Sequence, residues 1–165
     1  MKKIKNNKLV ARTKEVAVRP QLSQNCDTSS IKFKIFVSET GSDALQQYID
    51  GLDPAVIQKF KTRVRYLKNT PVPDWKKADV KKLKDFAILE IKLDANKKEH
   101  RPLGYFGPGK SEFTILEWAT HKQDIYDPHN AIKTANARRT LVENGSASCV
   151  PLKIDGEEFP SAEES

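Results

Sequence analysis

Three consecutive strand-like segments lie between residues 86 and 120, and this run constrains the fold more than any other feature. The segments are residues 86–93, 100–106 and 112–120, separated only by turns such as ANKKE and GPGKS. In the first segment, apolar side chains alternate with a second set that includes Glu90 and Lys92, as in a strand with two different faces. Because strands joined by short turns pair antiparallel, the sequence predicts an antiparallel sheet here.

Helices are predicted on both sides of this run. Residues 45–52 and 56–67 each carry an apolar stripe at helical spacing, and Asp53 and Pro54 between them form an N-cap and a first-turn proline. We expect helices joined so closely to form an antiparallel hairpin. A strand is predicted at residues 31–37 and a C-terminal helix from Pro128 onward, so the element order is β-α-α-β-β-β-α.

Charge divides the chain into three parts. Residues 1–30 hold seven Lys or Arg against two acids, and residues 146–165 hold one Lys against five acids. Neither segment has a sustained apolar period, so we expect a basic flexible arm at 1–30 and an acidic flexible tail at 146–165. The folded core is then predicted at residues 31–145, which is enough chain for one domain.

Charge, apolar content and cysteine content limit the kinds of partner, membrane segment and metal site that the sequence predicts. The net charge of +7 indicates an anionic partner, with nucleic acid first and an anionic membrane surface second. No apolar run is long enough for a secretory signal or a membrane span. With two cysteines and no C-x-x-C pair, a structural zinc site is not expected, and the low cysteine content fits a reducing cytoplasm.

The segment GYFGPGKS, residues 104–111, matches the letters of a phosphate-binding P-loop. A P-loop requires a helix directly afterwards, because the helix N-terminus supplies part of the phosphate cradle. Here EFTILEWAT follows, which is strand-like, and Pro108 removes a backbone donor from the loop. The segment is therefore predicted to be a hairpin turn rather than a nucleotide site.

Basic side chains on the predicted strands offer a different site. If the strands pair antiparallel, Lys92, Arg101 and the His121–Lys122 pair converge on one concave face. Such a face suits a phosphodiester better than a mononucleotide. Glu90 is expected there either to orient a basic neighbour or to form a plain ion pair.

Several ordered motifs resemble the toxins of the RelE/ParE superfamily, most closely the HigB-like group derived from phages. KKLKDFAILEIKLD is similar to their K-x-L…L-x-E-(L/I)-(R/K) segment, and HRPLGYFGPGKSEFTILEWATHKQ to the strand, turn and strand that follow it. The final A-x-x-x-A-x-x-R-R helix also fits. The resemblance spans residues 31–143 and implies an α+β, RelE-like fold. In that fold, a small, curved, mainly antiparallel sheet packs against an N-terminal helical hairpin and a C-terminal helix.

The resemblance also implies a function. It suggests the toxin of a type II toxin–antitoxin pair, a cytoplasmic endoribonuclease that cuts mRNA on the ribosome without metal or cofactor. Its partners would be the ribosome, mRNA and a cognate antitoxin of helix-turn-helix type. By matching positions, the implied catalytic residues are Lys92, Arg101, His121, Lys122 and Tyr126, and the implied RNA-binding residues are Lys81, Lys82, Lys84, Tyr105 and Lys110.

Within this set, Lys92 and Arg101 are expected to stabilise phosphate charge, and His121 is the candidate acid or base near neutral pH. Tyr126 is a candidate proton donor or base-stacking group. Two other functions remain open. A ParE-like inhibitor of DNA gyrase has the same expected fold without catalysis, and a phage or mobile-element protein could be a non-toxic binding module.

Overall fold

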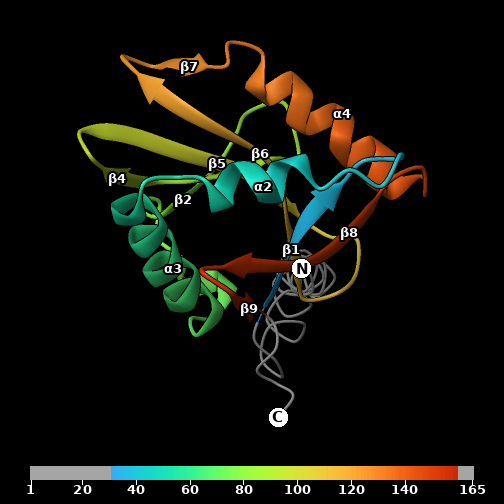
Figure 1. Ribbon diagram of the computed structural model, residues 1–165, viewed down its shortest axis with the longest axis horizontal. Coiled ribbons are helices and arrows are strands. Elements are labelled where there is room, and N and C mark those ends of the chain that lie inside the picture. The colour runs from blue at the N-terminus through green and yellow to red at the C-terminus, as the bar shows by residue number, and fades with distance from the viewer. Residues whose placement is uncertain (1–30, 160–165) are drawn as a thin grey trace, which may run out of the picture.

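The computed structural model describes residues 31–159 of the 165-residue chain (Figure 1). Within this range the helices are α2 (Ala44–Asp50), α3 (Pro54–Lys68) and α4 (Ala131–Glu143), with a short 3₁₀ turn at Val72–Asp74. The nine strands are β1 (Lys32–Val37), β2 (Val80–Lys82), β3 (Leu89–Ile91), β4 (Leu93–Ala95), β5 (Lys98–Phe106), β6 (Glu112–Lys122), β7 (Ile125–Asp127), β8 (Ser148–Ile154) and β9 (Glu157–Phe159).

These strands form a mixed sheet in the order β2-β3-β5-β6-β1-β8-β9, with β4 beside β5 and β7 beside β6. The β1–β6 pair is parallel, and the other described pairs are antiparallel. The long β5–β6 hairpin is the centre of the sheet and corresponds to the second and third predicted strands. β4 and β7 both pair with the end of this hairpin that contains His100 and His121.

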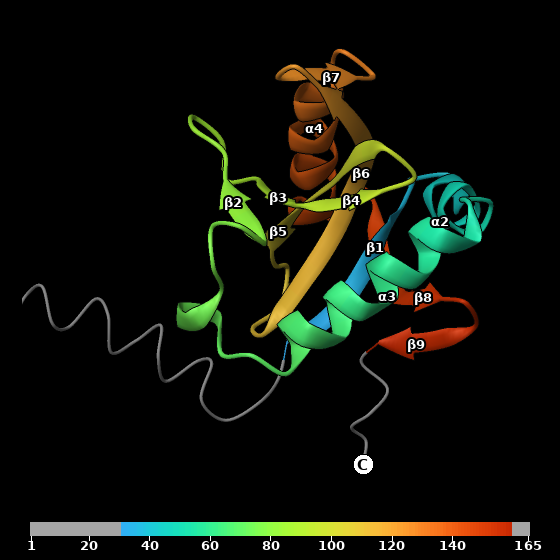
Figure 2. The ribbon, with the colours of Figure 1, turned by 90° about the vertical axis from the view of Figure 1, so that its left-hand side faces the viewer.

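Helices cover the two faces of the sheet unequally. α3 packs on β4, β1 and β8, whereas α4 packs on β6, β5 and β8. Figures 1 and 2 show α3 and α4 on different sides of the strands, with α2 between them over β1, β6 and β8. Asp53 caps α3 by accepting a hydrogen bond from the Ala55 N–H, and Pro54 occupies its first turn, as the sequence predicts.

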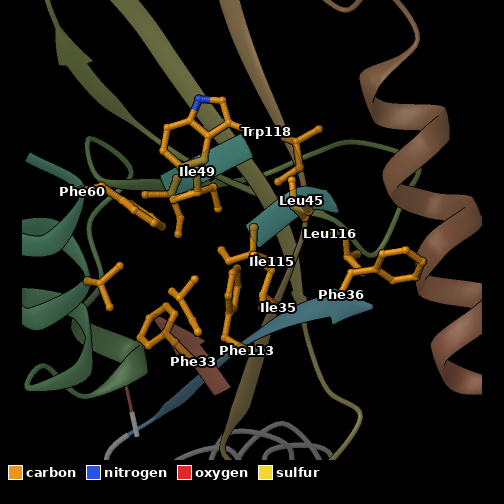
Figure 3. Packing of buried hydrophobic residues seen from close by; sticks show 14 of the residues in the cluster. Phe33, Ile35, Phe36, Leu45, Ile49, Phe60, Phe113, Ile115, Leu116 and Trp118 are labelled. Carbon is orange, nitrogen blue, oxygen red and sulfur yellow. The ribbon is translucent and has the colours of Figure 1, made fainter. Parts of the chain in front are cut away.

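The main core lies between β1, β6 and α3. Phe33, Ile35, Phe113 and Ile115 are fully buried there (Figure 3). Alternation along β1 sends Phe36 to the other face, where the Arg138 guanidinium of α4 stacks 5.0 Å from the centre of its ring. Burial of each such side chain stabilises the fold by roughly 1.5–3 kcal/mol.

A β-bulge in β6 changes which side chains face α3. Leu103 of β5 lies opposite Glu117, but the next residue, Gly104, lies opposite Ile115, so Leu116 is the extra residue. The bulge restores Trp118 to the face that Ile115 occupies, and the Trp118 indole packs edge-on against Phe60 of α3 at 4.9 Å. Beyond the bulge, the residues that alternate with Trp118 therefore point to the opposite face of the sheet. His121 is one of them.

Gly104 makes this bulge possible. A Cβ atom at this position would lie 2.5 Å from both the Phe113 ring and the Thr114 carbonyl oxygen. Only glycine allows the two strands to approach so closely here.

The expected fold class is wrong. The sheet is large and mixed, with nine described strands, so the structure is a sheet-dominated α+β arrangement rather than a small RelE-like sheet with a helical hairpin. α2 has only seven residues, and both α2 and α3 pack mainly on strands. The sequence interpretation placed too few strands because it missed three-residue strands and the C-terminal β8–β9 hairpin.

The predicted tail boundary also needs correction. Residues 148–159, expected within a flexible tail, form β8 and β9, and β8 pairs with β1 over residues 148–151. The apolar side chains of Leu152, Ile154 and Phe159 are buried, so the folded core continues to residue 159. The predicted basic arm, residues 1–30, and residues 160–165 lie outside the described part of the chain. Among the helices of residues 31–159, none combines the length and apolar character needed to cross a membrane.

Candidate functional site

An open cleft of about 1080 Å³ lies beside the polar end of the β5–β6 hairpin. One wall is β2 and the loop after it, which contribute Lys81, Lys82 and Lys84. The opposite side is formed by His121 of β6, Tyr126 of β7 and Ile132 of α4. Five residues that the sequence interpretation selected therefore line one cavity: Lys81, Lys82, Lys84, His121 and Tyr126.

Strand register brings the polar residues behind this cleft to one face of the sheet. Glu99 and Arg101 are two residues apart on β5, and they lie opposite His121 and Ala119 of β6. His121 in turn lies opposite Tyr126 of β7. Because side chains that pair across antiparallel strands share a face, these groups are neighbours.

His121 is held by a carboxylate. Its Nδ1 lies 3.0 Å from Glu99 Oε1, and its side chain is 15% exposed. An ionised carboxylate only accepts hydrogen bonds, so Nδ1 carries the proton of the neutral ring and Nε2 is left as the acceptor. This Nε2 lies 3.9 Å from Oδ1 of Asp124, whose side chain is fully exposed.

Tyr126 is held by a second carboxylate. Its hydroxyl donates to Glu90 Oε1, and its ring centre lies 4.9 Å from that of His121. Burial raises the pKa of Tyr126 well above its usual range, and the hydrogen bond to Glu90 adds to this effect. The phenol therefore stays protonated at neutral pH, and Glu90 accepts its hydroxyl proton in a hydrogen bond.

Arg101 lies behind these two groups rather than in the cleft. It is 7% exposed, and three carboxylates surround its guanidinium. Nη2 lies 3.2 Å from Glu99, Nη1 lies 3.3 Å from Asp94, and Nε lies 3.9 Å from Glu90. Nη1 also donates to the His100 carbonyl oxygen at 2.8 Å.

The lysine wall of the cleft has a simple origin. β2 is a three-residue edge strand in which only Val80 is buried, so the lysines after it extend into solvent. Lys81 pairs with Glu90 of β3 and shares its face, and Leu83 anchors the chain before Lys84. Phe86 and Ala87 follow in the same loop and give the cleft an apolar side.

The remaining predicted site residues are more scattered. Lys92 lies between β3 and β4. Both strands pair with β5 in one continuous register, which places Lys92 opposite Arg101. Lys122 is exposed and, by alternation, points to the face opposite His121. Tyr105 is buried near Glu143 and Arg139 of α4, where burial raises its pKa above the usual range.

Lys110 is far from the cleft, because the turn that contains it precedes β6 and His121 lies near the end of that strand. At the usual rise per residue this separation is about 30 Å. The turn prediction for GYFGPGKS is confirmed, because β5 ends at Phe106, β6 begins at Glu112, and the Gly107 N–H donates to the Glu112 carbonyl oxygen. No helix follows the turn, so it lacks the framework of a P-loop.

Sequence reasoning missed several members of the site. Glu99 was assigned to the ANKKE turn, although its spacing from Arg101 is that of two residues on one strand face. Phe86 and Ile132 were predicted to lie on a strand and a helix. Nothing in the sequence indicates that these two segments meet at a cleft. Asp94 was not selected, because the three-residue strand β4 was not predicted.

No group of three or more His, Cys, Asp or Glu side chains in residues 31–159 is arranged to hold a metal ion. The side chains of the cleft are suited to proton transfer and to stabilising negative charge on a ligand.

The chain matches no known family model, no curated protein and no solved structure.

Proposed function

We propose that this protein binds RNA in the cleft and cleaves it by metal-independent acid–base chemistry. The observation that carries the proposal is the Glu99–His121 pair at the wall of a lysine-lined cleft. A histidine whose one nitrogen is held by a carboxylate and whose other nitrogen faces a cleft is the usual acceptor for a hydroxyl proton. Lysines on the facing wall supply the positive charge that a phosphodiester requires.

The reaction follows from these groups. His121 Nε2 accepts the proton of the ribose 2′-hydroxyl, and the 2′-oxygen attacks the adjacent phosphorus. The bond from phosphorus to the 5′-oxygen breaks, that oxygen takes a proton from water, and the resulting hydroxide recovers the proton held by His121. Lys81, Lys82 and Lys84 stabilise the negative charge that develops on the phosphoryl oxygens. The products are a 2′,3′-cyclic phosphate and a 5′-hydroxyl.

The sequence resemblance supports a biological setting for this activity. In this setting the chain would be a toxin of a type II toxin–antitoxin system that inhibits translation by cutting mRNA on the ribosome. A helix-turn-helix antitoxin is the partner expected in that setting. This part of the proposal rests on the motifs and on the basic cleft, not on the fold.

The direct test incubates 5′-labelled RNA, free and bound in translating ribosomes, with purified protein in the presence of EDTA. We expect products that end in a 2′,3′-cyclic phosphate. His121→Asn should slow cleavage by roughly 10²- to 10⁴-fold, the contribution typical of a general base. His129→Asn is the matched control, because His129 is exposed and is not among the residues that line the cleft.

Cleavage that requires a divalent ion, or a His121→Asn variant as active as the wild type, would overturn the proposed chemistry. Expression in a bacterial host then tests the toxin setting. Growth arrest with new mRNA 5′-hydroxyl ends supports it.

A non-catalytic binding protein is the second candidate, and the environment of Arg101 favours it. Three carboxylates already surround this guanidinium, so its charge is not free for a phosphate. The same expression experiment separates the candidates. Growth arrest with double-strand DNA breaks indicates inhibition of gyrase, and the absence of arrest indicates a binding module.

A further inference from the structure

The side chains behind the cleft form a closed ring of five residues: His121, Glu99, Arg101, Glu90 and Tyr126. One oxygen, Glu99 Oε1, joins two of them, because it lies 3.0 Å from His121 Nδ1 and 3.2 Å from Arg101 Nη2. A carboxylate oxygen has two lone-pair directions, so it can accept from both donors at once. Glu99 therefore connects the histidine to the arginine.

Glu90 makes a weaker connection on the other side, an ion pair without a hydrogen bond, because Arg101 Nε has no hydrogen-bond partner among the described residues. Its Oε1 accepts from the Tyr126 hydroxyl, and its Oε2 lies 3.9 Å from Arg101 Nε. The His121 and Tyr126 rings, 4.9 Å apart, close the ring at the cleft wall. Each of the two groups that face the cleft is thus held by a carboxylate, and Arg101 contacts both carboxylates.

Arg101 itself is directed away from a ligand. It does not line the cleft, and its guanidinium is enclosed by Glu90, Asp94, Glu99 and the His100 carbonyl oxygen. Glu90, at 3% exposed, is buried as deeply as an apolar core residue. Burying a carboxylate without a partner of opposite charge is costly, and Arg101, whose Nε lies 3.9 Å from Glu90 Oε2, is the cation that pairs with it.

We propose that Arg101 is a positioning residue that holds Glu99 and Glu90, and through them His121 and Tyr126, in their orientations at the cleft. This assigns Arg101 a different task from the phosphate contact expected from sequence. The inference deepens the proposed function and rests on it for its effect on cleavage. Its effect on the His121 ring is independent of any cleavage.

The test compares Arg101→Met, Arg101→Lys and Glu99→Gln with the wild type in three measurements. The first is the ¹⁵N chemical shifts of the His121 ring, which report which nitrogen carries the proton. The second is the affinity for a single-stranded RNA oligonucleotide, and the third is the cleavage rate. Glu99→Gln guards against misfolding, because the Glu99 side chain is 48% exposed and its replacement leaves the buried Glu90–Arg101 pair intact.

We expect Arg101→Met to mix the two His121 tautomers and to leave RNA affinity within about twofold. Cleavage should fall by roughly 10- to 100-fold at saturating RNA, the range typical for loss of a group that orients a functional histidine. Arg101→Lys should recover only part of this loss, because an ammonium cannot present a planar fork to two carboxylates. Glu99→Gln should disturb the His121 tautomer in the same way.

A different result would overturn the inference. If Arg101 bound phosphate, Arg101→Met would weaken RNA binding severalfold and leave the His121 ring signals unchanged. A protein that cleaves no RNA, but whose His121 tautomers mix in Arg101→Met and Glu99→Gln, would contradict the proposed function and support the positioning role. Unchanged tautomers in both variants would exclude that role, whatever the activity.

Discussion

His100 and His121 belong to the same β5–β6 hairpin but have opposite surroundings. His100 lies on the face covered by α3, is 4% exposed, and its Nδ1 accepts a hydrogen bond from Trp118 Nε1 at 3.1 Å. Its Nε2 is buried without a hydrogen-bond partner. His121 lies on the other face, pairs with Glu99 and lines the cleft.

The difference shows how neighbours decide what a histidine can do. Burial lowers the pKa of His100, and nearby Lys98 and Arg101 lower it further against the opposing effect of Asp94. The ring is therefore neutral and inaccessible, and it serves the core. His121 has a carboxylate behind it and open space before it, so it combines an oriented ring with access to a ligand.

Trp118→Phe should lower the free energy of unfolding by removing the hydrogen bond that His100 accepts. The phenyl ring keeps much of the packing against Phe60 but removes the N–H that His100 Nδ1 accepts. Both His100 nitrogens would then be buried without partners, which costs about 1–3 kcal/mol, and the smaller ring adds a packing loss.

The free energy of unfolding from urea titration measures this effect. His121→Asn is the comparison variant and should change stability by less than about 1 kcal/mol. Equal stability losses in the two variants would show that both histidines serve the core.

The pH dependence of the free energy of unfolding should also reveal the contribution of His100. Since the pKa of His100 is lower in the folded protein, the unfolded chain binds its proton more readily. The contribution of His100 is thus complete above the ordinary histidine pKa of about 6.5 and is lost as the pH falls toward its lowered folded value. Stability should decrease on acidification from pH 7.5 to 5.5.

His100→Gln isolates this contribution, because the glutamine oxygen can still accept from the Trp118 indole but does not titrate in this range. Urea titrations at both pH values should show a smaller acid loss for this variant than for the wild type. An identical loss in both proteins would assign the pH dependence to other groups.

Sequence reasoning located the hairpin that carries both histidines but not the bulge that determines their faces. Strand-like composition predicted the strands near residues 100–106 and 112–120, and the GPGKS turn between them was identified from its glycines and proline. The face of each residue beyond Leu116 depends on the bulge, which arises from strand pairing around Gly104. Local periodicity contains no such information, because the extra residue is defined only by its partner strand.

The same lack of information about strand pairing explains which residues of the candidate site could be predicted. Lys81, Lys82, Lys84, His121 and Tyr126 were selected as basic or titratable groups at motif positions, and they line one cleft. Glu99 and Glu90, which hold His121 and Tyr126, act through pairings between strands. The β8–β9 hairpin was missed because β8 lies beside β1, more than 100 residues earlier in the chain, and only that contact gives its short apolar pattern a partner.

Lys82→Ala should have the smallest effect and tests whether the cleft binds a nucleic acid backbone. Lys82 is exposed, so its loss should leave stability unchanged. If it contacts one phosphate of single-stranded RNA, the slope of log affinity against log salt should become less steep by about 0.7.

Lys59→Ala is the matched control, since Lys59 is exposed on α3 and is not among the residues lining the cleft. Fluorescence anisotropy with a labelled oligonucleotide from 50 to 300 mM salt gives both slopes. A slope that changes equally in both variants would mean that RNA responds to net charge alone. A change confined to Lys82 would place the backbone in the cleft that His121 lines, whereas His100 is buried in the core.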